Sequence, residues 1–122
     1  MDLEARTAEL FEHFATQELE GVSSLFAPGA GVRQNGNPEH GIDGLLTMIQ
    51  GLKRDGVRVD YSDIRRNVGE RFVVEQHVRR LTRADGVSAS SDVCVVVHFD
   101  SAGLISGLHE YVDTAAFASL LA

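Results

Sequence analysis

One carboxylate stands where an apolar side chain is expected. Glu110 lies two residues from Leu108 and two from Val112, and alternate residues of a strand share a face. Desolvation among apolar side chains raises the pKa of a carboxyl group and suits it to proton transfer. We therefore expect Glu110 to line a cavity, with a raised pKa, as a proton carrier. The alternative is an ion pair with Arg33 or Arg79, which would lower that pKa and make Glu110 a structural residue.

A second candidate is His77, which shares a strand face with Glu75 and Arg79. A histidine oriented by a carboxylate can act as a general base, whereas a row of charged residues is also typical of a solvated or dimer-facing surface. The pattern favours the surface, because the other face carries apolar side chains, namely Phe72, Val74 and Val78. On that interpretation Gln76, which shares the apolar face, is the residue that faces the cavity.

Asn35 and Tyr61 are further candidates for contacts with a substrate. A metal site is not expected, because the histidines lack the i,i+4 or His-x-His spacing that typically marks one. They are His13, His40, His77, His98 and His109. The single cysteine, Cys94, lies in a β-rich run and is interpreted as a small buried hydrophobe. We therefore expect a pocket that holds no metal and needs no organic cofactor.

The charge of the chain argues against two classes of partner. Its formal net charge is -7, and its 11 basic residues are spread along the sequence. Nucleic acids and anionic membranes would require clustered Lys and Arg. A single cysteine forms no intrachain disulfide, and the first residues lack the pattern of a signal peptide. These features indicate a cytoplasmic protein without a membrane span.

Helical periodicity precedes strand periodicity along the chain. Helices are predicted from Leu3 to Phe14, from Leu19 to Phe26, from about Ile42 to Leu52 and from Thr114 to Leu121, with a short strand at 32–35. Four long strands are predicted at 57–68, 71–83, 87–99 and 104–112, joined by short turns. Helices followed by an antiparallel meander predict one α+β domain over residues 1–122, with a curved sheet packed on the N-terminal helices.

One face of the strand at 87–99 is apolar, which bears on the assembly. This face comprises Val87, Ala89, Val93, Val95, Val97 and Phe99. If it is the second surface of the sheet, so many apolar side chains are not expected to remain in water. The sequence therefore predicts a homodimer.

The closing segment Gly103-x-Ile105 to Tyr111-x-Asp113 resembles a pattern common in the SnoaL-like branch of the nuclear transport factor 2-like superfamily. The strand at 73–79, the Asp85-Gly86 turn and the helix start at 41–44 fit the same pattern. The resemblance implies a conical, cystatin-like α+β roll with a deep apolar pocket, which often dimerises through the outer sheet face. Ketosteroid isomerases and limonene epoxide hydrolases are relatives in this superfamily.

The resemblance implies particular site residues and leaves others unmatched. Epoxide hydrolases of this group use an Asp-Arg-Asp set, in which Glu110 matches the carboxylate on the last strand. His77-x-Arg79 replaces the expected Arg-x-Asp, and Arg33-x-Asn35 is the nearest match to a supporting Tyr-x-Asn pair. The Tyr and Asp pattern of ketosteroid isomerases is not recognisable. SnoaL-type cyclases use an Asp with a His, a pair that Glu110 could form with His77 or His109.

Two functions follow from these residues. The first is a cofactor-free enzyme that isomerises, cyclises or hydrates an apolar substrate, with Glu110 and His77 catalytic and Asn35, Tyr61 and Gln76 binding the substrate. The second is a non-catalytic module that binds an apolar molecule or serves dimerisation. A histidine that opens into the same cavity as Glu110 favours the enzyme, and Glu110 alone in a salt bridge favours the binding module.

Overall fold

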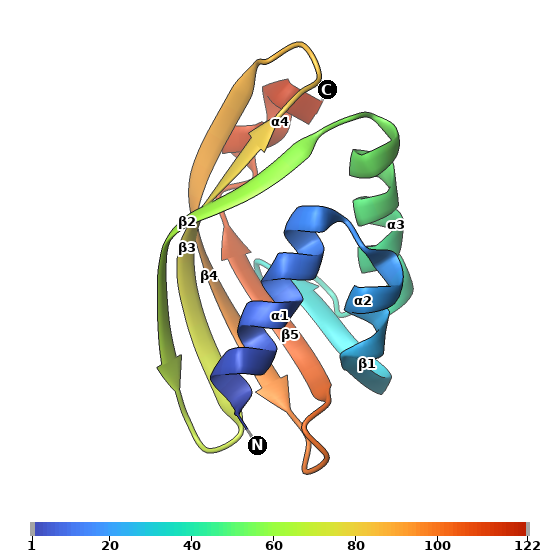
Figure 1. Cartoon of the computed structure of the whole chain (residues 1–122), viewed down its shortest axis with the longest axis vertical. Helices are drawn as coiled ribbons and strands as arrows, with labels where there is room; N and C mark the ends of the chain where they lie inside the picture. Colours follow the sequence, from blue (N-terminus) through green and yellow to red (C-terminus); the bar gives the residue numbers. More distant parts are fainter. Residues whose placement is uncertain (1, 122) are drawn as a thin grey trace.

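The protein is an α+β roll, seen in a computed structural model that describes residues 2–121 (Figure 1). Its helices are α1 (Leu3–Thr16), α2 (Leu19–Ser24), α3 (Ile42–Arg54) and α4 (Ala115–Leu121). Its strands are β1 (Phe26–Gln34), β2 (Arg58–Val68), β3 (Phe72–Thr82), β4 (Ser88–Phe99) and β5 (Ile105–Val112). One curved sheet holds the strands in the order β1-β5-β4-β3-β2. The predicted fold class is confirmed.

Helix α1 begins and ends where its sequence supplies caps. The Asp2 side chain accepts a hydrogen bond from the Ala5 amide at 3.0 Å, as an N-cap does. The buried stripe of the helix is Thr7, Leu10, Phe11 and Phe14. The helix ends at Gln17, whose φ of 57° places it in the left-handed region, where Gly or Asn is more usual. The chain therefore turns sharply at Gln17 and continues into α2.

The edge strand β1 is longer than predicted and runs parallel to its neighbour β5. It begins at Phe26, so the Pro28-Gly29 segment lies inside a strand instead of ending a helix. Its register against β5 shifts between Phe26 and Gly31, which lets a proline lie in an edge strand. Beyond that shift Gln34 stands beside Glu110. The antiparallel meander of β2 to β5 matches the predicted hairpins.

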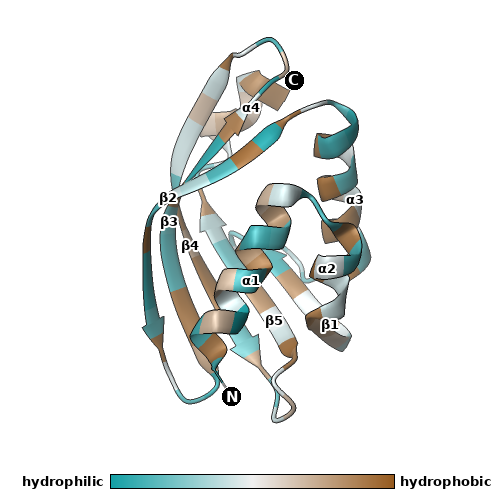
Figure 2. Ribbon diagram, in the orientation of Figure 1, coloured by the Kyte–Doolittle hydropathy of each residue, from teal (hydrophilic) through white to brown (hydrophobic). Residues whose placement is uncertain are grey.

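The face of β3 that turns inward is the opposite of the predicted one. Glu75 and His77 are fully buried, while Phe72 is 40% exposed and Gln76 lies on the exposed side. The prediction that Gln76 faces the cavity is therefore wrong. Apolar and polar residues are mixed along β3, as the hydropathy colouring of Figure 2 shows. The charged face is the inner one because its charges find partners, including Arg66 on β2 and Glu110 on β5. Charged side chains can be buried when they are paired. The prediction for β3 considered only the apolar content of each face and therefore chose the wrong one.

The apolar face of β4 also turns inward. Val93, Val95, Val97 and Phe99 belong to the core cluster under the helices. They are not a second surface of the sheet, so this reason for expecting a homodimer is wrong. The outer face of β4 instead carries half-buried Cys94 and Val96.

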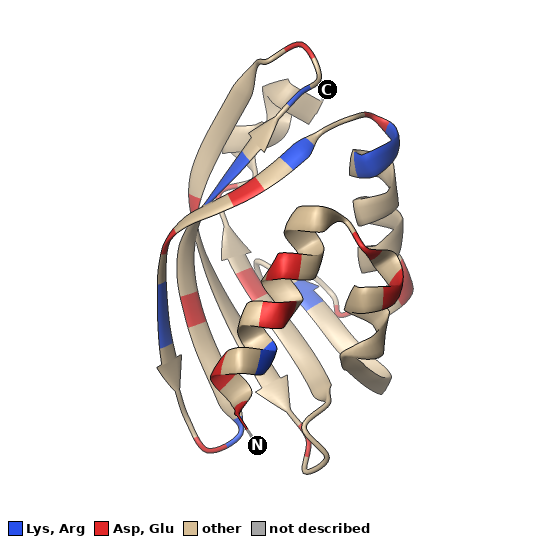
Figure 3. Cartoon of the chain, viewed as in Figure 1, with Lys and Arg blue, Asp and Glu red and all other residues tan. Residues whose placement is uncertain are grey.

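Many of the charged residues lie on the helices and on the edge strand β2. Figure 3 shows Asp and Glu along α1 and beyond α2, with Lys and Arg over β2 and the end of α3. Within the described residues, no helix is both long enough and apolar enough to cross a membrane.

The inward orientation of β4 can be tested with two matched deletions. Val95 has no exposed surface, while Val68, at the end of the edge strand β2, is 53% exposed. We expect Val95→Ala to lower the free energy of unfolding by about 2–3 kcal/mol, through lost burial and a residual cavity. Val68→Ala should change it by less than about 0.5 kcal/mol. Urea unfolding measures both, and equal losses would contradict the assignment of the inner face.

Candidate functional site

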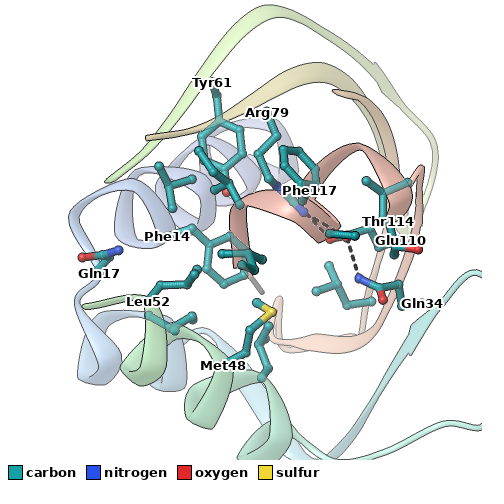
Figure 4. A pocket seen from close by; sticks show the side chains of 18 residues that line it. Phe14, Gln17, Gln34, Met48, Leu52, Tyr61, Arg79, Glu110, Thr114 and Phe117 are labelled. Carbon is teal, nitrogen blue, oxygen red and sulfur yellow. Dashed lines mark hydrogen bonds and ion pairs between the residues drawn. The ribbon is translucent and has the colours of Figure 1, made fainter. Parts of the chain in front are cut away.

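A cavity of about 260 Å³ lies between α1, α3, α4 and the inner face of the sheet (Figure 4). Most of its wall is apolar, formed by Phe14, Leu45, Met48, Ile49, Leu52, Val59, Leu81, Leu108, Val112, Phe117, Ala118 and Leu121. Polar groups come from Gln17, Gln34, Tyr61, Arg79, Glu110 and Thr114. A mainly apolar concavity with a few polar groups is typical of small-molecule sites. Glu110 and Tyr61 are both among the residues that line this cavity.

The polar wall is built around a two-pronged ion pair. Arg79 Nη1 donates to Glu110 Oε1 at 3.1 Å, and Arg79 Nη2 donates to Glu110 Oε2 at 2.7 Å. Gln34 Nε2 donates to Oε1 at 3.1 Å, because the parallel pairing of β1 and β5 sets Gln34 beside Glu110. Arg79 reaches Glu110 across β4, which separates their strands. Both charged side chains are largely buried, at 15% and 16% exposure.

This environment lowers the pKa of Glu110. Desolvation alone would raise that pKa, but the charge of Arg79 and the hydrogen bonds from Arg79 and Gln34 outweigh it. The predicted raised pKa is therefore wrong, and the ion-pair alternative with Arg79 applies. Burial opposes the charge of Arg79, but the neighbouring Glu110 carboxylate outweighs burial and raises the pKa of Arg79. Glu110 is accordingly an ionised carboxylate at neutral pH.

Tyr61 supplies a neutral hydroxyl beside this pair. Burial raises the pKa of Tyr61 to about 12, although the nearby charge of Arg79 acts in the opposite direction. The phenol therefore keeps its proton at physiological pH and remains a hydrogen-bond donor. An ionised acceptor and a neutral donor thus face one apolar cavity.

A second charged cluster lies deeper in the core, behind Tyr61. Arg66 Nε and His77 Nδ1 each lie 2.5 Å from a different oxygen of Glu75. A bulge at Asp63, with φ of 51°, turns Arg66 inward to face Glu75. His77 packs edge-on against Phe11 and lies 4.6 Å, centroid to centroid, from the tilted Tyr61 ring. The interpretation of this row of charges as a surface is wrong, because each member is buried with a partner.

His77 does not meet Glu110 in the cavity. Its side chain has no exposed surface, and the cavity wall is formed by Tyr61 in front of it. Its Nε2 atom has no hydrogen-bond partner among residues 2–121. His77 therefore does not open into the same cavity as Glu110, which was the arrangement expected of an enzyme. Glu110 forms a salt bridge with Arg79 instead.

The remaining predicted residues lie away from the cavity. Asn35 is exposed and clamps the backbone of Val112, donating to its carbonyl at 2.8 Å and accepting from its amide at 2.9 Å. Its role is to hold β1 and β5 together. Gln76 lies on the exposed face of β3, and His109 packs against His98 at 5.1 Å on the outer side of the sheet. No group of three potential metal ligands exists among the described residues.

Sequence reasoning missed three of the polar residues at the cavity, namely Gln17, Gln34 and Thr114. Gln34 was overlooked because its proximity to Glu110 depends on a parallel pairing over 76 positions of sequence, which no local pattern reveals. Gln17 was overlooked because the end of a helix carries no periodic signal. No local pattern of the sequence marks Gln17, since its left-handed conformation is seen only in the structure.

Comparison with known proteins identifies the family of this domain. The profile of the SnoaL-like domain matches residues 7–108. The chain belongs to the SnoaL-like domain family. That match spans Gln34, Tyr61, His77 and Arg79 and ends two residues before Glu110. No protein of curated function matched the sequence.

Solved structures share the fold of this SnoaL-like domain at low sequence identity. A candidate polyketide cyclase from Xanthomonas campestris superposes with a TM-score of 0.82 at 13% identity, covering 98% of this chain and 96% of the other. A candidate polyketide cyclase from Pseudomonas putida gives 0.83 at 11% identity, covering 100% and 99%. An LEH-like epoxide hydrolase from M. tuberculosis gives 0.77 at 15% identity, covering 96% and 86%. At such identities the likeness shows the fold alone.

The ion pair predicts a particular loss of stability in acid. A carboxyl group whose folded pKa is depressed stabilises the fold above its unfolded pKa and loses that effect as the pH falls through the folded pKa. At pH 7 Glu110→Gln should lower the free energy of unfolding by about 3 kcal/mol, because Arg79 is left without its counter-charge. This difference should shrink as the pH falls below the ordinary glutamate value of 4.5.

Urea unfolding of both proteins between pH 7 and pH 2.5 measures this difference. Glu12→Gln, on the exposed side of α1, is the control, and its free energy of unfolding should stay close to that of the wild-type protein throughout. A Glu110→Gln difference that grows toward low pH would contradict the lowered pKa of Glu110.

Proposed function

We propose that this SnoaL-like domain binds a neutral, mainly apolar small molecule in the cavity. The observation that carries the proposal is the composition of the wall: apolar side chains surround an Arg79–Glu110 pair whose charges cancel. A ligand with a net charge would meet no uncompensated partner there and would be desolvated at high cost. A hydroxyl or carbonyl group suits the wall, since Tyr61 can donate to it.

The volume of the cavity limits the size of the ligand. An engineered apolar cavity of about 150 Å³ holds one benzene ring. A cavity of about 260 Å³ is therefore suited to a molecule of about two rings, or a larger one that extends through the mouth. Exposed Met48 and Leu121, at 49% and 50%, offer apolar surface where such a molecule would emerge. The names of the structural neighbours, which refer to polyketide cyclisation and epoxide hydrolysis, support an oxygenated ligand.

Binding can be tested with 2-naphthol, a neutral two-ring phenol. We expect wild-type protein to bind it and Tyr61→Phe to weaken binding about tenfold, the effect of one lost hydrogen bond. Gln76→Ala, on the exposed face of β3, is the matched control and should bind as wild type does. Isothermal titration calorimetry measures the dissociation constants. Absence of binding, or equal binding by the Tyr61→Phe variant, would overturn the proposed pocket chemistry.

Cofactor-free acid-base catalysis is the second candidate function. The observation that favours it is an ionised carboxylate and a neutral phenol in one apolar cavity. Such a pair can remove a proton beside a carbonyl group while the phenol stabilises the developing oxyanion. Isomerisation, cyclisation and hydration all contain steps of this kind. Against it stands the full engagement of Glu110 with Arg79 and Gln34, which reduces its basicity.

Exchange of carbon-bound protons separates catalysis from binding. In D₂O, 2-tetralone gains deuterium beside its carbonyl when a base removes a proton and a deuteron returns. If Glu110 is that base, the wild-type protein accelerates exchange, Glu110→Gln abolishes the acceleration, and Tyr61→Phe reduces it. Proton NMR follows the reaction. Tight binding of 2-tetralone without accelerated exchange would assign the domain to the non-catalytic class.

The outer face of the sheet is the surface through which we propose that the domain dimerises. The helices cover the inner face (Figure 1), and the outer face carries Val74, Val96 and Tyr111, the last 50% exposed. Val74 pairs with Val96 across β3 and β4, and Tyr111 pairs with Cys94, which lies two residues from Val96 on the same face of β4. A second copy would bury them by the same face on both subunits.

A charge introduced on this outer face should separate the subunits. We expect wild-type protein to sediment as a dimer at micromolar concentration and Val96→Glu to sediment as a monomer. Gln50→Glu, on the exposed side of α3, is the control and should leave the dimer intact. Analytical ultracentrifugation measures the mass of each, and a wild-type monomer would refute dimerisation.

A further inference from the structure

Gln17 places an amide group at the other end of the cavity from Glu110. It caps α1 with a φ of 57°, and its Nε2 atom donates to the Val57 carbonyl at 2.7 Å. Figure 4 shows it on one side of the cavity, with Glu110 and Gln34 on the opposite side. Phe14 and Met48 lie between the two sides in this view. The polar groups of the wall are thus divided between two ends, with apolar side chains between them.

The side chain of Gln17 is not needed for the helix to end there. A left-handed position at the end of a helix favours Gly or Asn, because other side chains are strained in this conformation. The backbone amide of Gln17 already caps the helix by donating to the His13 and Phe14 carbonyls. Strained residues at the edge of a cavity are frequently functional. What Gln17 adds over glycine is a half-buried amide at the cavity wall.

This amide keeps free capacity for hydrogen bonding. An amide offers two N–H donors and a carbonyl oxygen with two lone pairs. The Val57 carbonyl occupies one donor. The second N–H and the Oε1 atom have no hydrogen-bond partner within residues 2–121, so a ligand group that donates or accepts could engage either.

We propose that Gln17 is a specificity-determining contact for the far end of the ligand. The ligand class is an elongated, neutral molecule with an apolar middle and a hydroxyl or carbonyl group at each end. One polar group meets Tyr61 and Glu110, and the other meets the Gln17 amide. This inference rests on the proposed binding function and adds the second polar group to it. The uncharged amide agrees with a ligand that carries no net charge.

The test compares probes that differ by one hydroxyl group. The pairs are 2-naphthol with 2,6-dihydroxynaphthalene, and 4-phenylphenol with 4,4'-dihydroxybiphenyl, which cover two lengths. Calorimetry gives the affinity gain, the ratio of the two dissociation constants within each pair. For the pair of matching length, we expect a gain of about tenfold in wild-type protein, equivalent to one hydrogen bond.

Two variants assign that gain to Gln17. Gln17→Met keeps the length of the side chain but removes the amide, and Gln17→Asn suits the left-handed backbone but retracts the amide by one methylene. We expect the gain to fall below about twofold in both, while binding of the monohydroxylated probes is retained. Because each gain is a ratio within one protein, a general loss of stability in a variant cancels.

The outcomes separate the two proposals. Wild-type protein that binds the monohydroxylated probes but gains nothing from the second hydroxyl overturns the role of Gln17 and leaves the proposed function standing. A gain that persists in both variants also overturns it. Failure of all four probes to bind overturns the proposed function together with this inference.

Discussion

The inner face of the sheet carries charges, and each of them requires a partner. Glu75 is fully buried and meets both Arg66 and His77, while Glu110 meets Arg79 and Gln34. Loss of one partner from such a pair leaves a charge in an apolar environment, which is strongly destabilising. The two clusters therefore fix how β2, β3 and β5 sit relative to one another. The shape of the cavity depends on that fixed arrangement, because Tyr61 lies between the clusters.

Much of the fold could be predicted because local patterns determine it. Periodic apolar residues indicated α1 and α3, and short glycine-containing turns indicated the four-strand meander. The inner faces of β3 and β4 could not be assigned in the same way. For β3, apolar content favoured Phe72 and Val74, whereas the core accepted Glu75 and His77 because their partners arrive from other strands. Side-chain alternation shows that a strand has two faces but does not identify the buried one when charges are paired.

The site could be predicted only in part, for the same reason. Glu110 was recognised because Leu108 and Val112 flank it along its own strand, whereas Tyr61 was only a further candidate for a contact with a substrate. The pairing of Glu110 with Arg79 was an open alternative, since the reach of Arg79 across β4 follows from tertiary structure. Asn35 was assigned to the cavity, but its amide instead satisfies the backbone of Val112. Polar residues near strand ends serve such structural roles as readily as they serve ligands.

The parallel pairing of β1 with β5 has a consequence for how the protein is made. Gln34 and Glu110 are neighbours in space but 76 positions apart in sequence, and contacts between such distant segments form late and slowly in folding. During synthesis the N-terminal helices and β1 leave the ribosome well before β5. The polar wall of the cavity is therefore complete only when β5 has paired with β1 and β4. A ligand that recognises this wall would bind the finished domain and no earlier intermediate.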